Sequence, residues 1–326
     1  MIDGERNCDR RRVPFIGTKS DEVTLKLFQW TLFVDMLGYR DANGSICSDE
    51  DAKDFVEFME VNRNILDFSN RTEVKERYEK DDFDLYKYYD IDSCFVSDSI
   101  IITYKPKEVG ELINDELRFL HSANALFIIC MRLQTVIFNC FTEKGIFLRG
   151  GISSKYAYIK YNFAVGEGVI EAYLAESEVA KNPRIVLHPN IRENNRLIEK
   201  IELLSKLMYG GKSLIQSDPK DGNLFLDYIG YAISSSSLKS AAVARAALIN
   251  PIGLIAQKAV TKKFIQRHSE ALKRKIDEIT ENLERVETGS KEQEKIERVL
   301  SKFIWLKEYH NRSLAGEKEL GSYLIE

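Results

Sequence analysis

The feature that most constrains the fold is a pair of strand-like segments separated only by the tripeptide Ser97-Asp98-Ser99. Residues 84–104, with the sequence DLYKYYDIDSCFVSDSIIITY, are rich in the aromatic and β-branched residues that favour strands. Two strands joined by so short a connection must run antiparallel, because a parallel pair needs a long crossover. This hairpin argues against a doubly wound parallel sheet.

The first 190 residues alternate between strand-like and helix-like patterns. The sequence predicts further strands over 26–35, 146–153, 156–165 and 184–189, and helices over 49–68, 107–144 and 168–181. A capping box of Ser48 and Asp51 marks the start of the first helix, and Gly145 marks the end of the second. This order predicts an α+β fold of the palm or ferredoxin-like layout, with helices on one face of the sheet.

The pattern changes after about residue 190. Residues 191–209 look helical, residues 210–211 and 217–223 are loop-like, and the helical pattern resumes at about 236 with a break near Pro251. Sparse apolar positions over 262–310 predict exposed amphipathic helices that form a hairpin around Thr288-Gly289-Ser290. We therefore divide the chain into a polar lead-in (1–24), an α+β domain (25–190) and a mainly α-helical C-terminal extension (191–326).

One apolar run, residues 119–141, has about the 20 residues that a membrane span needs. Polar side chains that would be costly in lipid interrupt it at His121, Asn124, Arg132, Gln134 and Asn139. We therefore predict a buried helix and no membrane span.

Composition bears on the cellular compartment and on the partners expected for the chain. The five cysteines are scattered without a Cys-x-x-Cys pair, and the first residues lack the apolar core of a secretory signal, so we expect a cytoplasmic protein. The net charge is -4 and no basic face stands out, so a nucleic-acid partner is not expected. The four histidines are far apart and show no ligand spacing, which argues against a histidine metal site.

Two aspartates carry the chemistry that the sequence suggests. Asp35 ends a buried strand in FVDMLGY, and Asp98 lies at the hairpin in FVSDSIII. Carboxylates at the ends of apolar strands need partners, and two of them on neighbouring strands can share Mg²⁺ or Mn²⁺, which prefer oxygen ligands. The alternative is that both are ordinary turn or helix-capping aspartates.

The order of short motifs around these aspartates resembles the class III nucleotidyl cyclases. FVDMLGY at 33–39 is similar to their first-metal motif, FVSDSI at 95–100 to the second, FLRGGISSKYAY at 147–158 to a later strand, and AVGEGVIEAYLAE at 164–176 to the start of the last catalytic helix. The run through NPRIVLHP at 182–189 looks more closely like the Pycsar pyrimidine cyclases of bacterial antiphage defence. The resemblance spans about residues 28–190.

The chain departs from the family at several functional positions. Ser97 and Lys155 stand where glycines are expected, and Cys94 and Phe163 replace the lysine and aspartate that read a purine base. Ile170 and Leu174 replace the transition-state asparagine and arginine, so charge stabilisation must come from elsewhere. The candidates are Arg149, Lys155, Lys160 and Arg184, and the alternative for each is a solvated or cross-strand charge. The loss of both purine-reading residues favours a pyrimidine substrate.

The resemblance implies a cyclase that converts CTP or UTP into cyclic CMP or cyclic UMP and pyrophosphate. Asp35 and Asp98 would hold two divalent cations, Mn²⁺ or Mg²⁺, with the carbonyl of Met36 as a further ligand. The substrate would lie against six positions: Phe33, Gly38, Tyr39, Cys94, Arg149 and Phe163. Tyr39 could equally be a core residue.

The resemblance further implies a homodimer with composite active sites, and a second messenger that activates a separate antiphage effector. Two alternatives remain open at this point. One is a degenerate cyclase that binds nucleotide and regulates a partner, and the other is a palm-type enzyme that makes oligonucleotides.

Overall fold

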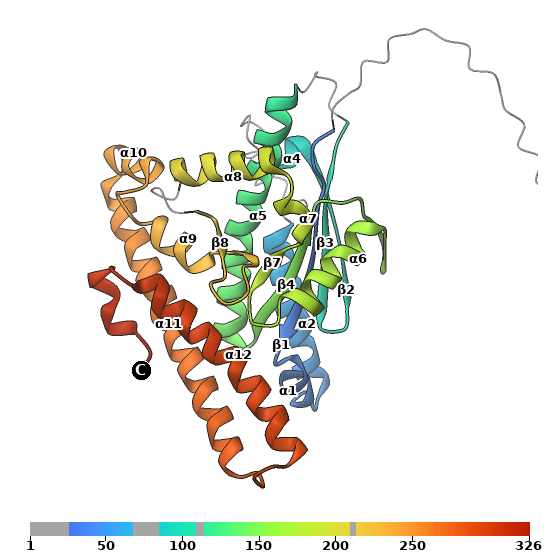
Figure 1. Ribbon diagram of the computed structural model, residues 1–326, viewed down its shortest axis with the longest axis vertical. Coiled ribbons are helices and arrows are strands. Elements are labelled where there is room, and N and C mark those ends of the chain that lie inside the picture. Colours follow the sequence, from blue (N-terminus) through green and yellow to red (C-terminus); the bar gives the residue numbers. More distant parts are fainter. Residues whose placement is uncertain (1–25, 68–84, 109–113, 209–212) are drawn as a thin grey trace, which may run out of the picture.

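The structure is a computed structural model that describes residues 26–67, 85–108, 114–208 and 213–326 (Figure 1). The predicted lead-in, residues 1–24, lies outside the described residues. The elements run in the following order: β1 (Trp30–Leu37), α1 (Tyr39–Gly44), α2 (Asp49–Leu66), α4 (Leu85–Tyr88), β2 (Tyr89–Val96), β3 (Ser99–Pro106), α5 (Asp115–Glu143), β4 (Phe147–Ser153), β5 (Tyr158–Lys160), β6 (Phe163–Val165), α6 (Glu167–Leu174), the π-helical turn η1 (Ala175–Val179), β7 (Ile185–Leu187), α7 (Pro189–Arg192), α8 (Asn195–Met208), β8 (Ile215–Ser217), β9 (Leu224–Leu226), α9 (Tyr228–Ser234), α10 (Ala241–Ile249), α11 (Pro251–Glu284), α12 (Lys291–Leu314) and the 3₁₀ helix η2 (Lys318–Tyr323).

The predicted α+β class is confirmed, and its centre is a mixed sheet with the strand order β2-β3-β1-β4-β7-β9-β8. β2 and β3 form the predicted hairpin, whose turn places Ser97 at a φ of 57°. β1 lies between β3 and β4 and is antiparallel to both, whereas β7 runs parallel to β4. The first part of the chain therefore builds a four-stranded unit in the order β4-β1-β3-β2, with α2 and α5 as connecting helices.

The two faces of the sheet are covered by different elements. Successive side chains of a strand point to opposite faces, and Trp30, Leu32, Val34 and Met36 of β1 all lie in the main hydrophobic core beneath α2 and α5. The Trp30 indole N–H fixes this packing by donating to the carbonyl of Ser122 in α5, at 3.0 Å.

The prediction that helices cover one face only is wrong, because α6 and the β5–β6 hairpin cover the other face (Figure 1). There Phe33 packs edge-on against Tyr173 of α6, with the ring centroids 5.4 Å apart. The segment 156–165 was expected to be one strand, but Tyr161 turns it into the two-stranded β5–β6 hairpin with a φ of 54°.

The long apolar helix α5 runs through the core. It begins at Asp115, where the Asn114 side chain accepts the Leu117 N–H, and it ends beside Gly145 at a φ of 65°. The predicted start at 107 is too early, because β3 continues to Pro106. Among the described residues α5 is the one helix long and apolar enough to cross a membrane, and 67% of its most apolar window is buried inside the protein.

The C-terminal region is mainly helical, as expected, but it also contributes β8 and β9 to the central sheet. Val186 of β7 pairs with Phe225 of β9, so the sheet continues across residue 190, where the sequence pattern changes. α11 and α12 form the predicted hairpin, with Gly289 in their connection at a φ of 83°. Phe264 and Phe303 of these helices lie in the same hydrophobic core as β1 and α5.

Candidate functional site

Asp35 and Asp98 meet at one end of the sheet. Asp35 pairs with Ser99 in the register of β1 and β3, and the Met36 N–H donates to the Asp98 carbonyl at 3.1 Å. The negative charge of Asp98 is one of the causes that raise the pKa of the Asp35 carboxyl. The hairpin turn thus brings together two carboxylates that lie far apart in the sequence.

A third carboxylate reaches the same place through Arg149. Arg149 is the direct cross-strand neighbour of Asp35 on β4, and its guanidinium donates to Asp35 Oδ2 at 3.1 Å. The same nitrogen forms an ion pair with Oε1 of Glu176, whose side chain is 4% exposed. Arg149 therefore joins Asp35 to Glu176.

Glu176 reaches Arg149 because the chain after α6 passes very close to β4. A Cβ atom on Gly151 would lie 2.2 Å from the Ala172 carbonyl oxygen and 2.7 Å from the Glu176 nitrogen, so only glycine allows this approach. Glu176 itself lies in the π-helical turn η1, a type of helix distortion that is frequent at functional sites.

The electrostatics of these groups show that they act on one another. Burial raises the pKa of Asp35, and Arg149 partly opposes that rise. Burial likewise raises the pKa of Glu176, with Arg149 opposing and Asp35 adding to the rise. Burial and the nearby Arg149 charge lower the pKa of Lys302, which reaches this group from α12. We call these five residues the carboxylate cluster: Asp35, Asp98, Arg149, Glu176 and Lys302.

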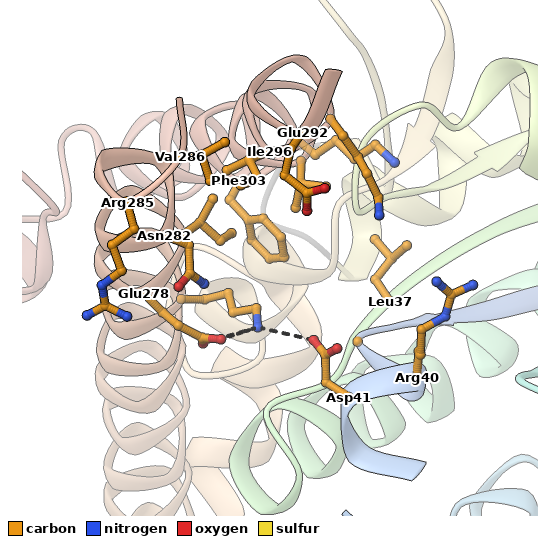
Figure 2. Close-up of a pocket in the computed structure, with 16 residues that line it drawn as sticks. Leu37, Arg40, Asp41, Glu278, Asn282, Arg285, Val286, Glu292, Ile296 and Phe303 are labelled. Atoms are coloured by element: carbon orange, nitrogen blue, oxygen red, sulfur yellow. Dashed lines mark hydrogen bonds and ion pairs between the residues drawn. The ribbon is translucent and has the colours of Figure 1, made fainter. Parts of the chain in front are cut away.

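A cavity of about 550 Å³ adjoins the carboxylate cluster. Its wall combines the turn after β1, which contains Leu37 and Gly38, with facing side chains of α11 and α12 (Figure 2). Gly38 has a φ of 98°, a conformation that other residues rarely adopt. Lys302 lines the cavity as well, so it links the cavity to the cluster.

The cavity wall carries more cations than anions. The basic residues are Arg40, Lys275, Arg285, Lys295 and Lys302, and the acidic ones are Asp41, Glu278 and Glu292. Lys275 lies between two of the carboxylates, 3.1 Å from Glu278 and 3.9 Å from Asp41 (Figure 2). The apolar part of the wall includes Ile296 and Phe303. A ligand with an anionic end and a flat apolar end would match this wall.

The other predicted substrate contacts lie in different surroundings. Tyr39 packs edge-on against Phe55 of α2, at 5.5 Å between ring centroids, which agrees with its alternative role as a core residue. Cys94 is buried beside Ile101 and Ile159, beneath the β5–β6 hairpin. Phe163, by contrast, is an exposed residue of β6.

Three of the four basic residues considered for charge stabilisation interact with groups other than Asp35 and Asp98. Arg184 is fully buried and forms ion pairs with Asp218 and Asp221, so it ties β7 to the β8–β9 turn. Lys155 lies 3.9 Å from Glu167, and the Lys160 amine lies over the Tyr161 ring. Of the four candidates, Arg149 alone contacts Asp35.

The donor set of the cluster fits a hard divalent cation. Asp35 and Asp98 offer carboxylate oxygens, and Mg²⁺ often takes only one or two carboxylates and completes its shell with water and substrate phosphates. Burial raises the pKa of Asp35, Asp98 adds to that rise, and Arg149 opposes it only in part, so a bound cation would stabilise the charged form of this carboxyl. Within the described parts of the chain no three His, Cys, Asp or Glu side chains converge as a complete protein-only site.

Glu176 and Lys302 were not singled out from the sequence. Glu176 closes the motif AVGEGVIEAYLAE, and the paired glycines at 150–151 are a signal that another segment passes close to β4. Lys302 lies in a highly charged helix, where nothing in the local pattern separates it from its solvated neighbours.

No protein-family model matches the chain, and none of the curated proteins with which it was compared matches it.

Proposed function

We propose that the chain is a nucleotidyl cyclase that converts a pyrimidine nucleoside triphosphate, CTP or UTP, into the 3′,5′-cyclic monophosphate and pyrophosphate. The observation that carries the proposal is the convergence of Asp35 and Asp98 at the end of β1 and the β2–β3 turn, beside a cavity with cationic walls. The strand order β4-β1-β3-β2, with helical connections after β1 and β3, supports a palm of the class III cyclase type.

The residues of the chain would divide the work of binding and orientation. Asp35 and Asp98, with the Met36 carbonyl, would hold two Mn²⁺ or Mg²⁺ ions. When bound, such ions activate the 3′-hydroxyl and neutralise the charge of the leaving pyrophosphate. Arg149, itself held by Glu176, orients the Asp35 carboxylate.

Cations that line the cavity supply the charge that the missing asparagine and arginine would give. Lys302 and Lys295 come from α12, and Arg40 follows the Gly38 turn. In the proposed complex they would contact the β- and γ-phosphates of a triphosphate whose α-phosphorus lies near Asp35 and Asp98. Because the attacking oxygen and the phosphorus belong to one molecule, holding the substrate folded provides much of the catalysis.

A homodimer with composite sites is part of the proposal. Large apolar side chains gather on the outside of the β5–β6 hairpin and α6: Tyr156, Tyr161, Phe163, Val165, Ile170 and Tyr173 are all exposed. Exposed apolar side chains on neighbouring elements are a common feature of protein–protein contact surfaces. The double variant Phe163→Glu and Ile170→Glu should shift the chain to a monomer in light scattering, whereas Leu203→Glu on α8 should not.

The test of the activity is incubation of the full chain with Mn²⁺ and each of the four nucleoside triphosphates, with pyrophosphate and product mass as readouts. Asp35→Asn and Asp98→Asn should each abolish the release of pyrophosphate from CTP or UTP. Asp90→Asn is the matched control, because Asp90 is an exposed residue of the same hairpin whose carboxylate forms an ion pair with Lys107, at 3.6 Å. Its activity should equal that of the wild type.

The same assay separates the alternatives. Nucleotide binding without any pyrophosphate release would replace the proposal with a regulatory nucleotide-binding protein. A product with the mass of a linked chain would replace it with an oligonucleotide synthase. A cyclic monophosphate should in turn activate a separate effector in the cytoplasm, and we propose that this signal serves antiphage defence.

A further inference from the structure

One stretch of the chain carries positive charge only. Residues 228–269 contain no aspartate or glutamate, although the whole chain has a net charge of -4. The same stretch contains six basic residues: Lys239, Arg245, Lys258, Lys262, Lys263 and Arg267. Such a block produces a local positive potential on an otherwise acidic protein.

This stretch contains a corner between α10 and α11, with large apolar side chains directed into solvent. Leu248 and Ile249 at the end of α10 are 87% and 88% exposed, and Ile252 and Ile255 at the start of α11 are 77% and 68% exposed. The corner lies at the end of α11 remote from the α11–α12 turn (Figure 1). We call these four residues the apolar tip.

The corner is held in a defined shape. The Asn250 N–H donates to the Ala246 carbonyl at 2.8 Å and closes α10, while the Asn250 side chain accepts the Gly253 N–H at 2.9 Å and caps α11. Pro251 occupies the first position of α11, where its missing N–H has no cost. The apolar tip is therefore presented by two capped helices.

The cations follow the apolar tip along α11. With a rise of about 1.5 Å per residue, Lys258 lies about 9 Å along the axis from Ile252, and Lys262 lies about 10 Å from Ile255. Lys239, Lys258, Lys262 and Lys318 also line one hollow of about 840 Å³, together with Glu317 and Glu319. A helix that lies in a membrane interface buries its apolar side chains about 5–10 Å deep and keeps its cations at the headgroups.

We propose that the apolar tip and its lysines dock the protein on a membrane surface that contains anionic lipids. Charge complementarity selects this occupant, since a second copy of the same corner would bring the six cations of residues 228–269 face to face, and the nearby carboxylates of Glu317 and Glu319 are too few to offset them. Four apolar side chains suffice for peripheral attachment and are far too few to span the bilayer. The inference does not depend on the proposed cyclase activity.

The test is sedimentation of the full chain with two kinds of vesicle, phosphatidylcholine alone and an equal mixture of phosphatidylcholine and phosphatidylserine. The chain should bind the mixed vesicles, and added salt should weaken this binding. Lys258→Gln with Lys262→Gln should weaken it about 25-fold, since each cation near an anionic surface contributes about fivefold. Serine at all four positions of the apolar tip should weaken it at least about tenfold.

The matched control is Leu203→Ser with Leu207→Ser on α8, two exposed apolar residues outside the corner, which should bind as the wild type does. All these side chains are exposed, so thermal unfolding should confirm that every variant is folded. Equal binding to both vesicles, or to neither, would overturn the proposal. The proposal would also fail if the wild type does not bind vesicles but self-associates in light scattering, and the serine variant does not self-associate. The occupant of the apolar tip would then be a second copy of the chain.

Discussion

Arg149 is surrounded by more negative charge than it can neutralise. It contacts Asp35 and Glu176 directly, while Asp98 adds a third carboxylate whose charge acts on both. The side chains of Asp35 and Glu176 are only 15% and 4% exposed, so water screens their repulsion weakly. Arg149 thus stabilises the fold as well as the proposed site.

The variant Arg149→Met should lower the free energy of unfolding by about 3 kcal/mol, because it leaves partly buried carboxylates without their cation. Lys302→Met is the comparison. Burial lowers the pKa of Lys302, so the folded state disfavours its charged form, and its removal should leave stability unchanged or slightly higher. Chemical denaturation measures the free energy of unfolding of both variants, and equal losses would contradict this account of the cluster.

Under the proposed function, Lys302→Met should still weaken triphosphate binding.

The residues of the site differ in how far the sequence could identify them. Asp35 and Asp98 could be chosen because each follows a run of apolar strand residues, where a charged side chain is costly unless it has a partner. Asp35 was expected to end its strand, but β1 continues to Leu37. Glu176 and Lys302 could not, since their place depends on how a π-helical turn and α12 pack on β4 and β1. Arg184 shows the converse: a basic residue that looked available is buried between two aspartates.

At the scale of elements, Gly151 sets how closely α6 and η1 approach β4. In Gly151→Ala the new methyl group would lie 2.2 Å from the Ala172 carbonyl oxygen and 2.6 Å from the Ala175 Cβ. The backbone must shift, so we expect a loss of about 1–3 kcal/mol of stability and displacement of Glu176 from Arg149. Gly44→Ala is the control, because nothing lies within 4 Å of the added methyl group, and thermal unfolding should separate the two variants.

Four elements of the C-terminal region are joined by a chain of hydrogen bonds through two buried histidines. His310 Nε2 lies 3.0 Å from the Tyr323 carbonyl, which can only accept, so His310 Nδ1 must accept from His268 Nδ1 at 3.0 Å. His268 Nε2 then accepts from the Tyr228 hydroxyl at 2.9 Å. This arrangement requires both imidazoles to be neutral.

The pH dependence of stability follows from that requirement. Burial lowers the pKa of His268, and of His310 as well, below the ordinary value of 6.5. At these two histidines the unfolded chain therefore binds more protons than the folded chain as the pH falls below about 6.5, so their contribution to stability decreases there. Melting temperatures measured from pH 8 to pH 5 should show this loss. It should be smaller in His268→Gln with His310→Gln.

Helices and strands could be predicted where the local sequence signal is strong and where their formation does not depend on contacts with distant parts of the chain. The capping box at Ser48 and the hairpin turn at Ser97 place α2, β2 and β3 within a few residues. β8 and β9 are only three residues each, and β9 joins the sheet through its pairing with β7, a tertiary contact that no local pattern contains.

At the scale of the whole molecule, the sheet and its core extend across the point where the sequence changes character. Arg184 lies before residue 190, while Asp218 and Asp221 lie after it. The Trp305 indole N–H of α12 donates to Asp218 Oδ2 at 2.6 Å, so the same buried group also holds the C-terminal hairpin. The two parts of the chain therefore depend on each other for buried charge as well as for apolar contacts.

Deletion of residues 191–326 should consequently prevent the rest from folding by itself. The fragment 1–190 would leave the Arg184 guanidinium without its carboxylates, free the edge of β7 and expose the core face that Phe264 and Phe303 cover. An exposed edge of this kind pairs readily with other chains, so we expect aggregation and no sharp thermal transition in circular dichroism. Adding residues 191–326 as a separate chain should restore part of the transition. A soluble 1–190 fragment that melts cooperatively would show instead that the α+β region is an independent domain and that α11 and α12 are an accessory to it.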